Sequence, residues 1–109
     1  MVEYRCTVER CLDGDTVEAV IDLGFDCWYK SPVRLKGINA PELKGATYAA
    51  GERARDFLAG ELAKGPVVIR TELRRDKDKY GRVLGTFLVQ GVDVNQAMIA
   101  AGHAVPYLV

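Results

Sequence analysis

Residues 4–22 read YRCTVERCLDGDTVEAVID, and polar and apolar side chains alternate along most of this stretch. Successive side chains of an extended strand point to opposite faces, so the alternation predicts strands with one face turned toward a core. The inward candidates of the first strand are Tyr4, Cys6, Val8 and Leu12. The tripeptide DGD at 13–15 interrupts the pattern as a tight turn or bulge, because glycine adopts backbone angles that other residues avoid. Two adjacent strands are therefore expected, one on each side of this turn.

Further along the chain, the spacing of the apolar residues changes. A loop at 23–26 leads to a third strand over 28–35, so that three adjacent strands form a meander. Between 47 and 64, apolar residues recur every three or four positions, which predicts an amphipathic helix. Its inward candidates are Ala50, Ala54, Phe57 or Leu58, and Leu62. The pair Gly65-Pro66 ends the helix, since proline cannot continue it.

Two more strands and a second helix complete the pattern. The strands are expected over 67–73 and 83–89, with the charged turn RRDKDKYG between them. The second helix starts at Asp93, which forms a capping-box-like pair with Gln96, and ends at Gly102. We therefore expect an α+β, mainly β fold. It is a five-stranded OB-fold barrel with two helices, the first inserted after strand three.

Length and charge limit the possible functions. The 109 residues are enough for one core, so residues 1–109 are expected to form a single domain. Lys and Arg number 15, and Asp and Glu also number 15, so no net positive field attracts a polyanion. Contact with nucleic acid therefore requires a local basic cluster. No apolar run reaches the ~20 residues that span a bilayer, so no membrane partner is expected.

The three cysteines, Cys6, Cys11 and Cys27, include no Cys-x-x-Cys pair and have no pair of histidines near them. This pattern argues against zinc and disulfides, and we expect buried or half-buried free thiols. The N-terminus lacks the apolar core of a signal peptide. A reducing, cytoplasmic setting fits these features, and a secreted mature form stays open.

The segment DGDTV (13–17) places Asp13 and Asp15 two residues apart. On extended backbone both carboxylates point to the same face, where they could meet a cation. DGD is also a common turn sequence, so this segment alone indicates only a turn.

The segment RLKGINAPE (34–42) combines a strand end, a glycine turn and an Asn-Ala-Pro kink, and is expected to bring Arg34 and Glu42 to nearly the same place. Arg34 could direct its planar set of donors at a phosphate or a carboxylate, and Pro41 restricts the direction of Glu42. Taken alone, such residues are typical of surface ion pairs.

The segment DKYGR (78–82) is, by itself, a solvated hairpin turn. Taken together, however, the order DGDTV, R-x-x-G-I-x-A-P-E, DKYGR and a V-N-x-A helix closely resembles the staphylococcal nuclease-like (thermonuclease) family. The resemblance covers almost the whole chain. It implies an OB-fold barrel and a calcium-dependent phosphodiesterase acting on DNA and RNA with low sequence specificity. The expected partners are single-stranded or frayed DNA, and RNA; the expected state is a monomer.

By the same resemblance, Arg34 and Arg82 match two arginines that hold the scissile phosphate. Glu42 matches a glutamate assigned as general base or as orienter of the attacking water. The physical reason is that phosphodiester hydrolysis concentrates negative charge on the phosphate oxygens, and guanidinium groups with a divalent cation neutralise that charge. Arginines and metal should therefore contribute more to catalysis than Glu42 does.

The resemblance also implies calcium ligands and substrate contacts. Asp15 matches a calcium-binding aspartate, and the Ala40 carbonyl matches a backbone ligand. The residues that resemble nucleotide contacts are Lys79 and Tyr80, with Tyr107 as a further aromatic candidate.

Asn39 departs from the family pattern, since active relatives usually carry aspartate at this position as a second calcium-binding carboxylate. An amide oxygen still ligates calcium but carries no charge, so weaker calcium binding is expected. Asp13 could supply the missing charge, directly or through water. The retained Arg34, Glu42 and Arg82 favour an active but more metal-demanding enzyme.

Two other interpretations stay open. One is a catalytically silent nuclease-like module that binds nucleic acid or protein, which Asn39 and the zero net charge favour. The other is an OB-type domain that binds oligosaccharide or protein. For His103, which follows the glycine that ends the second helix, a structural role is expected. Trp28 is expected in the core rather than as a stacking platform for bases.

Overall fold

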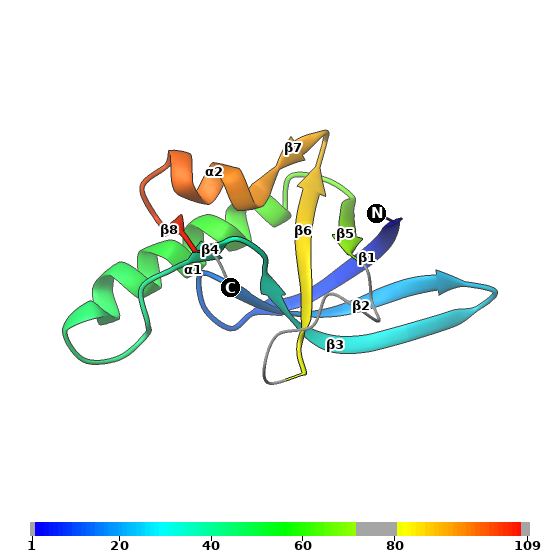
Figure 1. The fold of residues 1–109 in the computed structure, drawn as a ribbon, viewed down its shortest axis with the longest axis horizontal. Coiled ribbons are helices and arrows are strands. Elements are labelled where there is room, and N and C mark those ends of the chain that lie inside the picture. The colour runs from blue at the N-terminus through cyan, green and yellow to red at the C-terminus, as the bar shows by residue number, and fades with distance from the viewer. Residues whose placement is uncertain (1, 72–80, 108–109) are drawn as a thin grey trace.

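The computed structural model describes residues 2–71 and 81–107. Three antiparallel strands follow one another as the alternation predicted: β1 (Val2–Cys11), β2 (Thr16–Gly24) and β3 (Cys27–Leu35). Figure 1 shows β2 and β3 as a long hairpin that extends beyond the rest of the molecule.

Pairing of distant segments closes these strands into a five-stranded barrel. β1 pairs with β5 (Val67–Thr71), and β5 pairs with β6 (Val83–Val89). β6 then runs parallel to the end of β3, with Arg34 opposite Leu84. The barrel and the expected OB-type architecture are thereby confirmed.

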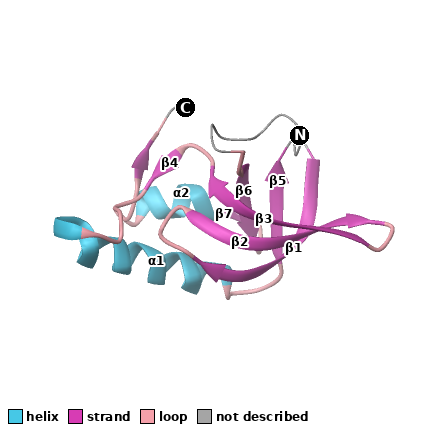
Figure 2. Cartoon of the chain, turned by 90° about the horizontal axis from the view of Figure 1, so that it is seen from below, coloured by secondary structure: helices cyan, strands magenta, loops and turns pink. Residues whose placement is uncertain are grey.

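The helices and the remaining short strands follow β3 and β6. After β3 come β4 (Ile38–Asn39), the 3₁₀ turn η1 (Gly45–Thr47) and α1 (Tyr48–Leu62). After β6 come β7 (Val92–Asp93), α2 (Val94–Ala100) and β8 (Val105–Pro106). β4 and β8 form a separate antiparallel pair. Figure 2 shows both helices at the end of the barrel away from the β2–β3 hairpin.

The predicted helical face of α1 is the one that the structure buries. Ala54, Leu58 and Leu62 join the core, and Phe57 packs against it partly buried. The second helix also begins as expected, because the Asp93 side chain accepts a hydrogen bond of 3.0 Å from the backbone amide of Gln96. Within the described residues, no helix is long and apolar enough to cross a membrane.

The expectation that Trp28 lies in the core is wrong. Trp28 is 61% exposed, and Phe25 at the hairpin turn is fully exposed. The reason is that β1 accompanies β2 only as far as the pair Cys6 and Ile21, so that among the described residues no neighbouring strand covers the outer part of the hairpin (Figure 1).

Two of the three thiols behave as predicted. Cys6 and Cys11 are half-buried, and burial raises the pKa of each to about 11, which keeps them protonated. Cys27 is exposed because it begins β3 in the uncovered part of the hairpin, so the expectation of a buried or half-buried thiol fails there.

Candidate functional site

Arg34 lies near the end of β3, and its side chain is only 12% exposed. Its Nη1 atom is 3.4 Å from Oδ2 of Asp15 and donates to the Leu35 and Ile38 carbonyls at 3.1 and 3.0 Å. Its Nη2 atom donates to Oδ1 of Asn39 at 3.2 Å. The guanidinium is therefore held in one orientation, with a carboxylate and an amide beside it.

Asp15 lies just before β2 and is 7% exposed. Its Oδ2 accepts a hydrogen bond of 2.8 Å from the Ala40 amide, and its Oδ1 accepts one of 3.2 Å from the Thr16 hydroxyl. The pKa of Asp15 is raised to about 6, mainly by burial and also by the nearby Asp13, while the Ala40 amide and Arg34 act in the opposite direction. Burial has the largest effect, so the negative charge of the ionised Asp15 carboxylate is only partly compensated by its neighbours.

The DGD segment is a close-packed turn rather than only a surface loop. Oδ1 of Asp13 accepts a hydrogen bond of 2.9 Å from the Asp15 amide. A Cβ atom at Gly14 would lie 2.7 Å from Cβ of Ala54 and 2.8 Å from Cβ of Ala40. The absent side chain thus lets the two aspartates approach both α1 and the Asn-Ala-Pro kink.

The four candidate metal-ligating positions fit a hard cation. Asp13, Asp15, Asn39 and the Ala40 carbonyl offer only oxygen atoms, the ligand type of calcium and magnesium. The buried, incompletely compensated Asp15 carboxylate is a group that a cation would stabilise. Within residues 2–71 and 81–107, however, no three Asp, Glu, His or Cys side chains cluster in a way that could hold a metal.

Tyr107 and Arg82 reach this region from the C-terminal half of the chain. The Tyr107 amide donates to the Gly37 carbonyl at 2.8 Å, and the Tyr107 ring centroid lies 5.9 Å from the guanidinium carbon of Arg34. Arg82 is half-buried and directly precedes β6, two residues before Leu84, the register partner of Arg34. Both residues are therefore at the end of the barrel where Arg34 lies.

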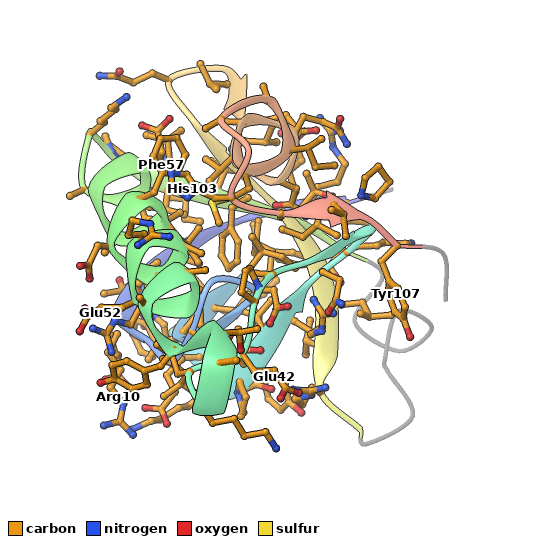
Figure 3. The ribbon with its side chains drawn as sticks, turned by 90° about the vertical axis from the view of Figure 1, so that its left-hand side faces the viewer. Arg10, Glu42, Glu52, Phe57, His103 and Tyr107 are labelled. Carbon is orange, nitrogen blue, oxygen red and sulfur yellow. The ribbon has the colours of Figure 1, made fainter. Side chains whose placement is uncertain are left out.

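The Glu42 side chain turns toward solvent and Lys44, rather than taking the position beside Arg34 that the sequence predicted. Its side chain is 72% exposed and pairs with Nζ of Lys44 at 3.5 Å. Figure 3 shows Glu42 near the start of α1, on the same side of the molecule as Tyr107. The described contacts do not bring its carboxylate onto Arg34. Lys79 and Tyr80 lie outside the described residues.

The backbone of Glu42 is nevertheless firmly held, by residues that the sequence did not single out. The Thr47 hydroxyl contacts the Glu42 carbonyl at 2.8 Å and that of Lys44 at 3.1 Å. A Cβ atom at Gly51 would lie 2.7 Å from the Glu42 carbonyl oxygen, so only glycine allows α1 to approach this closely. In the sequence, Gly51 on the inward face of the predicted helix was the feature that could have indicated this close contact.

Asn95 was also missed as a residue that supports the site. It is 1% exposed, and its Oδ1 accepts a hydrogen bond of 3.1 Å from the Phe87 amide. Its Nδ2 donates to the carbonyls of Lys36 and Gly85 at 2.9 and 3.0 Å. Asn95 thus ties α2 and β6 to the turn that follows Arg34. The sign in the sequence was a polar residue on the inward face of a short helix.

Comparisons with known proteins agree with this architecture. Residues 32–109 match the family described as staphylococcal nuclease homologue. The chain is 38% identical over 116 residues to Protein ParB of Escherichia coli, covering 96% of this chain and 58% of that protein. It is 32% identical over 114 residues to Micrococcal nuclease of Shigella flexneri, covering 96% and 59%. It is 29% identical over 126 residues to Endonuclease YhcR of Bacillus subtilis (strain 168), covering 98% and 9%. The chain thus spans less than two thirds of the length of each relative.

Proposed function

The chain belongs to the staphylococcal nuclease family, and on that premise we propose that it is a nuclease that hydrolyses phosphodiester bonds of DNA, RNA or both with low sequence specificity. One observation carries the proposal. The guanidinium of Arg34 and the carboxylate of Asp15 converge at 3.4 Å from distant parts of the chain, with Asn39 beside them. A cation-binding group and an anion-binding group at one point suit a metal-assisted reaction at a phosphate.

In this proposal Arg34 and Arg82 bind the scissile phosphate. Arg34 is pre-oriented by two backbone carbonyls and by Asp15, so little side-chain entropy is lost when a phosphate binds. Arg82 approaches from the start of β6, next to the end of β3. Two guanidinium groups stabilise the additional charge that develops on the phosphate oxygens as the bond breaks.

We propose calcium as the cofactor, held by Asp15, Asp13, Asn39 and the Ala40 carbonyl. The all-oxygen ligand set and the buried Asp15 carboxylate support this assignment. When bound, the ion supplies Lewis-acid polarisation of the phosphate and lowers the pKa of a bound water. Asn39 contributes an oxygen without charge, and its Oδ1 is shared with Arg34, so higher calcium concentrations are needed.

We propose that Glu42 orients the attacking water or removes its proton. Its present ion pair with Lys44 joins two highly exposed side chains, and such pairs are weak. The carboxylate can therefore leave Lys44 at little cost, while Thr47 and the close approach of Gly51 hold its backbone in place.

The proposed substrates are single-stranded or frayed DNA, and RNA, with the protein acting as a monomer. Because the Arg34 side chain is only 12% exposed, a flexible strand reaches it more easily than a regular duplex. Tyr107, 44% exposed beside Arg34, offers an aromatic face to one base. Lys79 and Tyr80 are proposed as further contacts on the family resemblance alone.

A second candidate function is a catalytically silent module that binds nucleic acid or protein. It is favoured because the described part of the chain has no group of three Asp, Glu, His or Cys side chains that could hold a metal. Such a module would bind DNA with a steep salt dependence and leave it intact.

The test is degradation of single-stranded DNA and RNA with calcium, magnesium or a chelator. Cleavage in calcium that is lost in chelator, and that falls by about 10²-fold or more in Glu42→Gln or Arg82→Ala, is the expected result. Glu52→Gln is the matched control for Glu42→Gln, because Glu52 is exposed on α1. Salt-dependent DNA binding with no cleavage at millimolar calcium, by either the wild type or Asn39→Asp, would leave the silent module as the function.

A further inference from the structure

A cavity of about 300 Å³ adjoins the candidate site on the side of Asn39. Its wall consists of two segments, the Asn-Ala-Pro kink with the start of α1 and the chain after α2. The lining residues are Asn39, Ala40, Pro41, Thr47, Gly102, His103, Ala104 and Val105. Asn39 and Ala40 thus belong both to the cavity and to the proposed cation site.

The wall of the cavity is mostly apolar, with a few polar groups whose positions are fixed. The His103 ring packs on Phe57 of α1, with 4.8 Å between centroids and an interplanar angle of 34°. The Thr47 hydroxyl is held by the carbonyls of Glu42 and Lys44. A mostly apolar wall with one imidazole suits a heteroaromatic ring, and 300 Å³ is at the small end of ligand pockets.

The pairing of β4 with β8 sets the position of the cavity relative to Arg34. Asn39 lies opposite Val105, and Tyr107 is two residues further along, about 7 Å away by the rise of a strand. Tyr107 is beside Arg34, whereas Val105 lines the cavity. Figure 3 shows the side chains of His103 and Tyr107 well separated, at the two ends of the chain segment that contains β8.

We propose that the cavity binds the nucleobase on one side of the scissile phosphate, while Tyr107 contacts the base on the other side. The inference rests on the proposed function, because continuity with the Arg34 and Asp15 cluster identifies the occupant. When the scissile phosphate lies at Arg34, the base on one side of it lies toward Tyr107 and the base on the other side lies toward Val105. His103 forms part of the wall of this base-binding cavity. Val105, which is 60% exposed, lies at its rim.

The first experiment narrows the cavity from its rim. Val105→Trp should raise KM for a thymidine octanucleotide about tenfold with kcat nearly unchanged, since base contacts contribute uniform binding. Val92→Trp is the matched control, because Val92 is 52% exposed and also lies in a two-residue strand. It should leave KM unchanged. Equal KM values for wild type, Val105→Trp and Val92→Trp would overturn the inference.

The second experiment is independent of cleavage. His103 is the single histidine of the chain, so its imidazole gives one set of NMR signals. A thymidine dinucleotide with a hydrolysis-resistant phosphorothioate link, in calcium, should shift these signals in the wild type and in Val92→Trp but not in Val105→Trp.

The two experiments separate the inference from the proposed function. Cleavage by the wild type without any shift of the His103 signals overturns the base-binding cavity and leaves the nuclease. A shift of the His103 signals without cleavage supports the cavity and rejects the nuclease. Neither cleavage nor shift rejects both, and shifts produced equally by a short peptide would also overturn the assignment to a nucleobase.

Discussion

The backbone amide of Ala40 donates a hydrogen bond of 2.8 Å to Oδ2 of Asp15, 25 positions earlier in the chain. The same carboxylate oxygen lies 3.4 Å from Nη1 of Arg34. One oxygen atom thereby joins the start of β2, the end of β3 and the Asn-Ala-Pro kink. A carboxylate that accepts from an amide and a guanidinium forms strong, charge-assisted contacts, so a change in any of these segments affects the other two.

Asn39→Asp should lower the calcium concentration needed for half-maximal cleavage by at least tenfold. A second full charge near the ion adds several kcal/mol of attraction at about 4 Å, before desolvation is subtracted. The measurement is a calcium titration of cleavage of single-stranded DNA. Gln96→Glu adds the same charge at an exposed position of α2 and is the control. Identical calcium curves for Asn39→Asp and Gln96→Glu would contradict the assignment of position 39 as a ligand.

Asp15→Asn should change how stability depends on pH when metal is absent. The pKa of Asp15 rises from 3.8 to about 6 on folding, so the folded protein holds this proton more tightly than the unfolded chain does. The stabilisation is complete below the unfolded pKa and is lost as pH rises through the folded pKa. The amide side chain of the variant does not titrate, so the free energy of unfolding of wild type relative to the variant should fall by about 2 to 3 kcal/mol between about pH 3.5 and 7.5.

Urea unfolding of both proteins across this pH range tests that expectation. Calcium added at neutral pH should restore stability to the wild type and much less to Asp15→Asn, because the ion binds the folded state through the ionised carboxylate. Parallel pH curves would show that burial of Asp15 does not control its ionisation.

Gly14→Ala should destabilise the protein by about 1 to 3 kcal/mol, since a new Cβ atom would overlap those of Ala54 and Ala40. Ala54→Gly in the same chain should recover part of this loss. Gly60→Ala is the control, because among the described residues no atom beyond its own stretch of helix lies within 4 Å of the added Cβ, and helix propensity should make this variant more stable by up to about 1 kcal/mol. Thermal unfolding measures all four proteins. If Gly14→Ala unfolds at the same temperature as the wild type, the turn is less tightly packed than the contacts indicate.

Asn95→Ala should lower the free energy of unfolding by about 2 to 4 kcal/mol, because it removes the buried hydrogen bonds of Asn95 with the Phe87 amide and with the carbonyls of Lys36 and Gly85. Cleavage should also fall, since the turn after Arg34 loses a support. Gln96→Ala, at an exposed neighbouring position, should change stability by less than about 0.5 kcal/mol. Urea unfolding of both variants is the measurement, and equal stabilities would argue against the Asn95 network.

Local patterns predicted most of the elements correctly. The helical spacing predicts Ala54, Leu62 and either Phe57 or Leu58 as inward residues, and Leu58 is the one that is fully buried. Asp93 is the N-cap of the second helix, as its pairing with Gln96 predicts. Trp28 and Cys27 were misplaced because alternation along a strand does not show whether another strand covers it. The roles of Arg34, Glu42 and Arg82 in catalysis stay predictions.

The sequence by itself determined the order of the five barrel strands and the two helices, and the chemical groups available for a phosphate and a cation. Strand alternation, helical periodicity and capping depend on residues only a few positions apart, so they can be recognised without coordinates. Tertiary structure alone decided that Asp15, Arg34 and Asn39 share one point, that Glu42 turns toward solvent and Lys44, and that a cavity opens beside Val105. The cluster arises where the start of β2 meets the end of β3, and the cavity where β4 meets β8, because packing between distant segments, rather than local backbone preference, brings their side chains together.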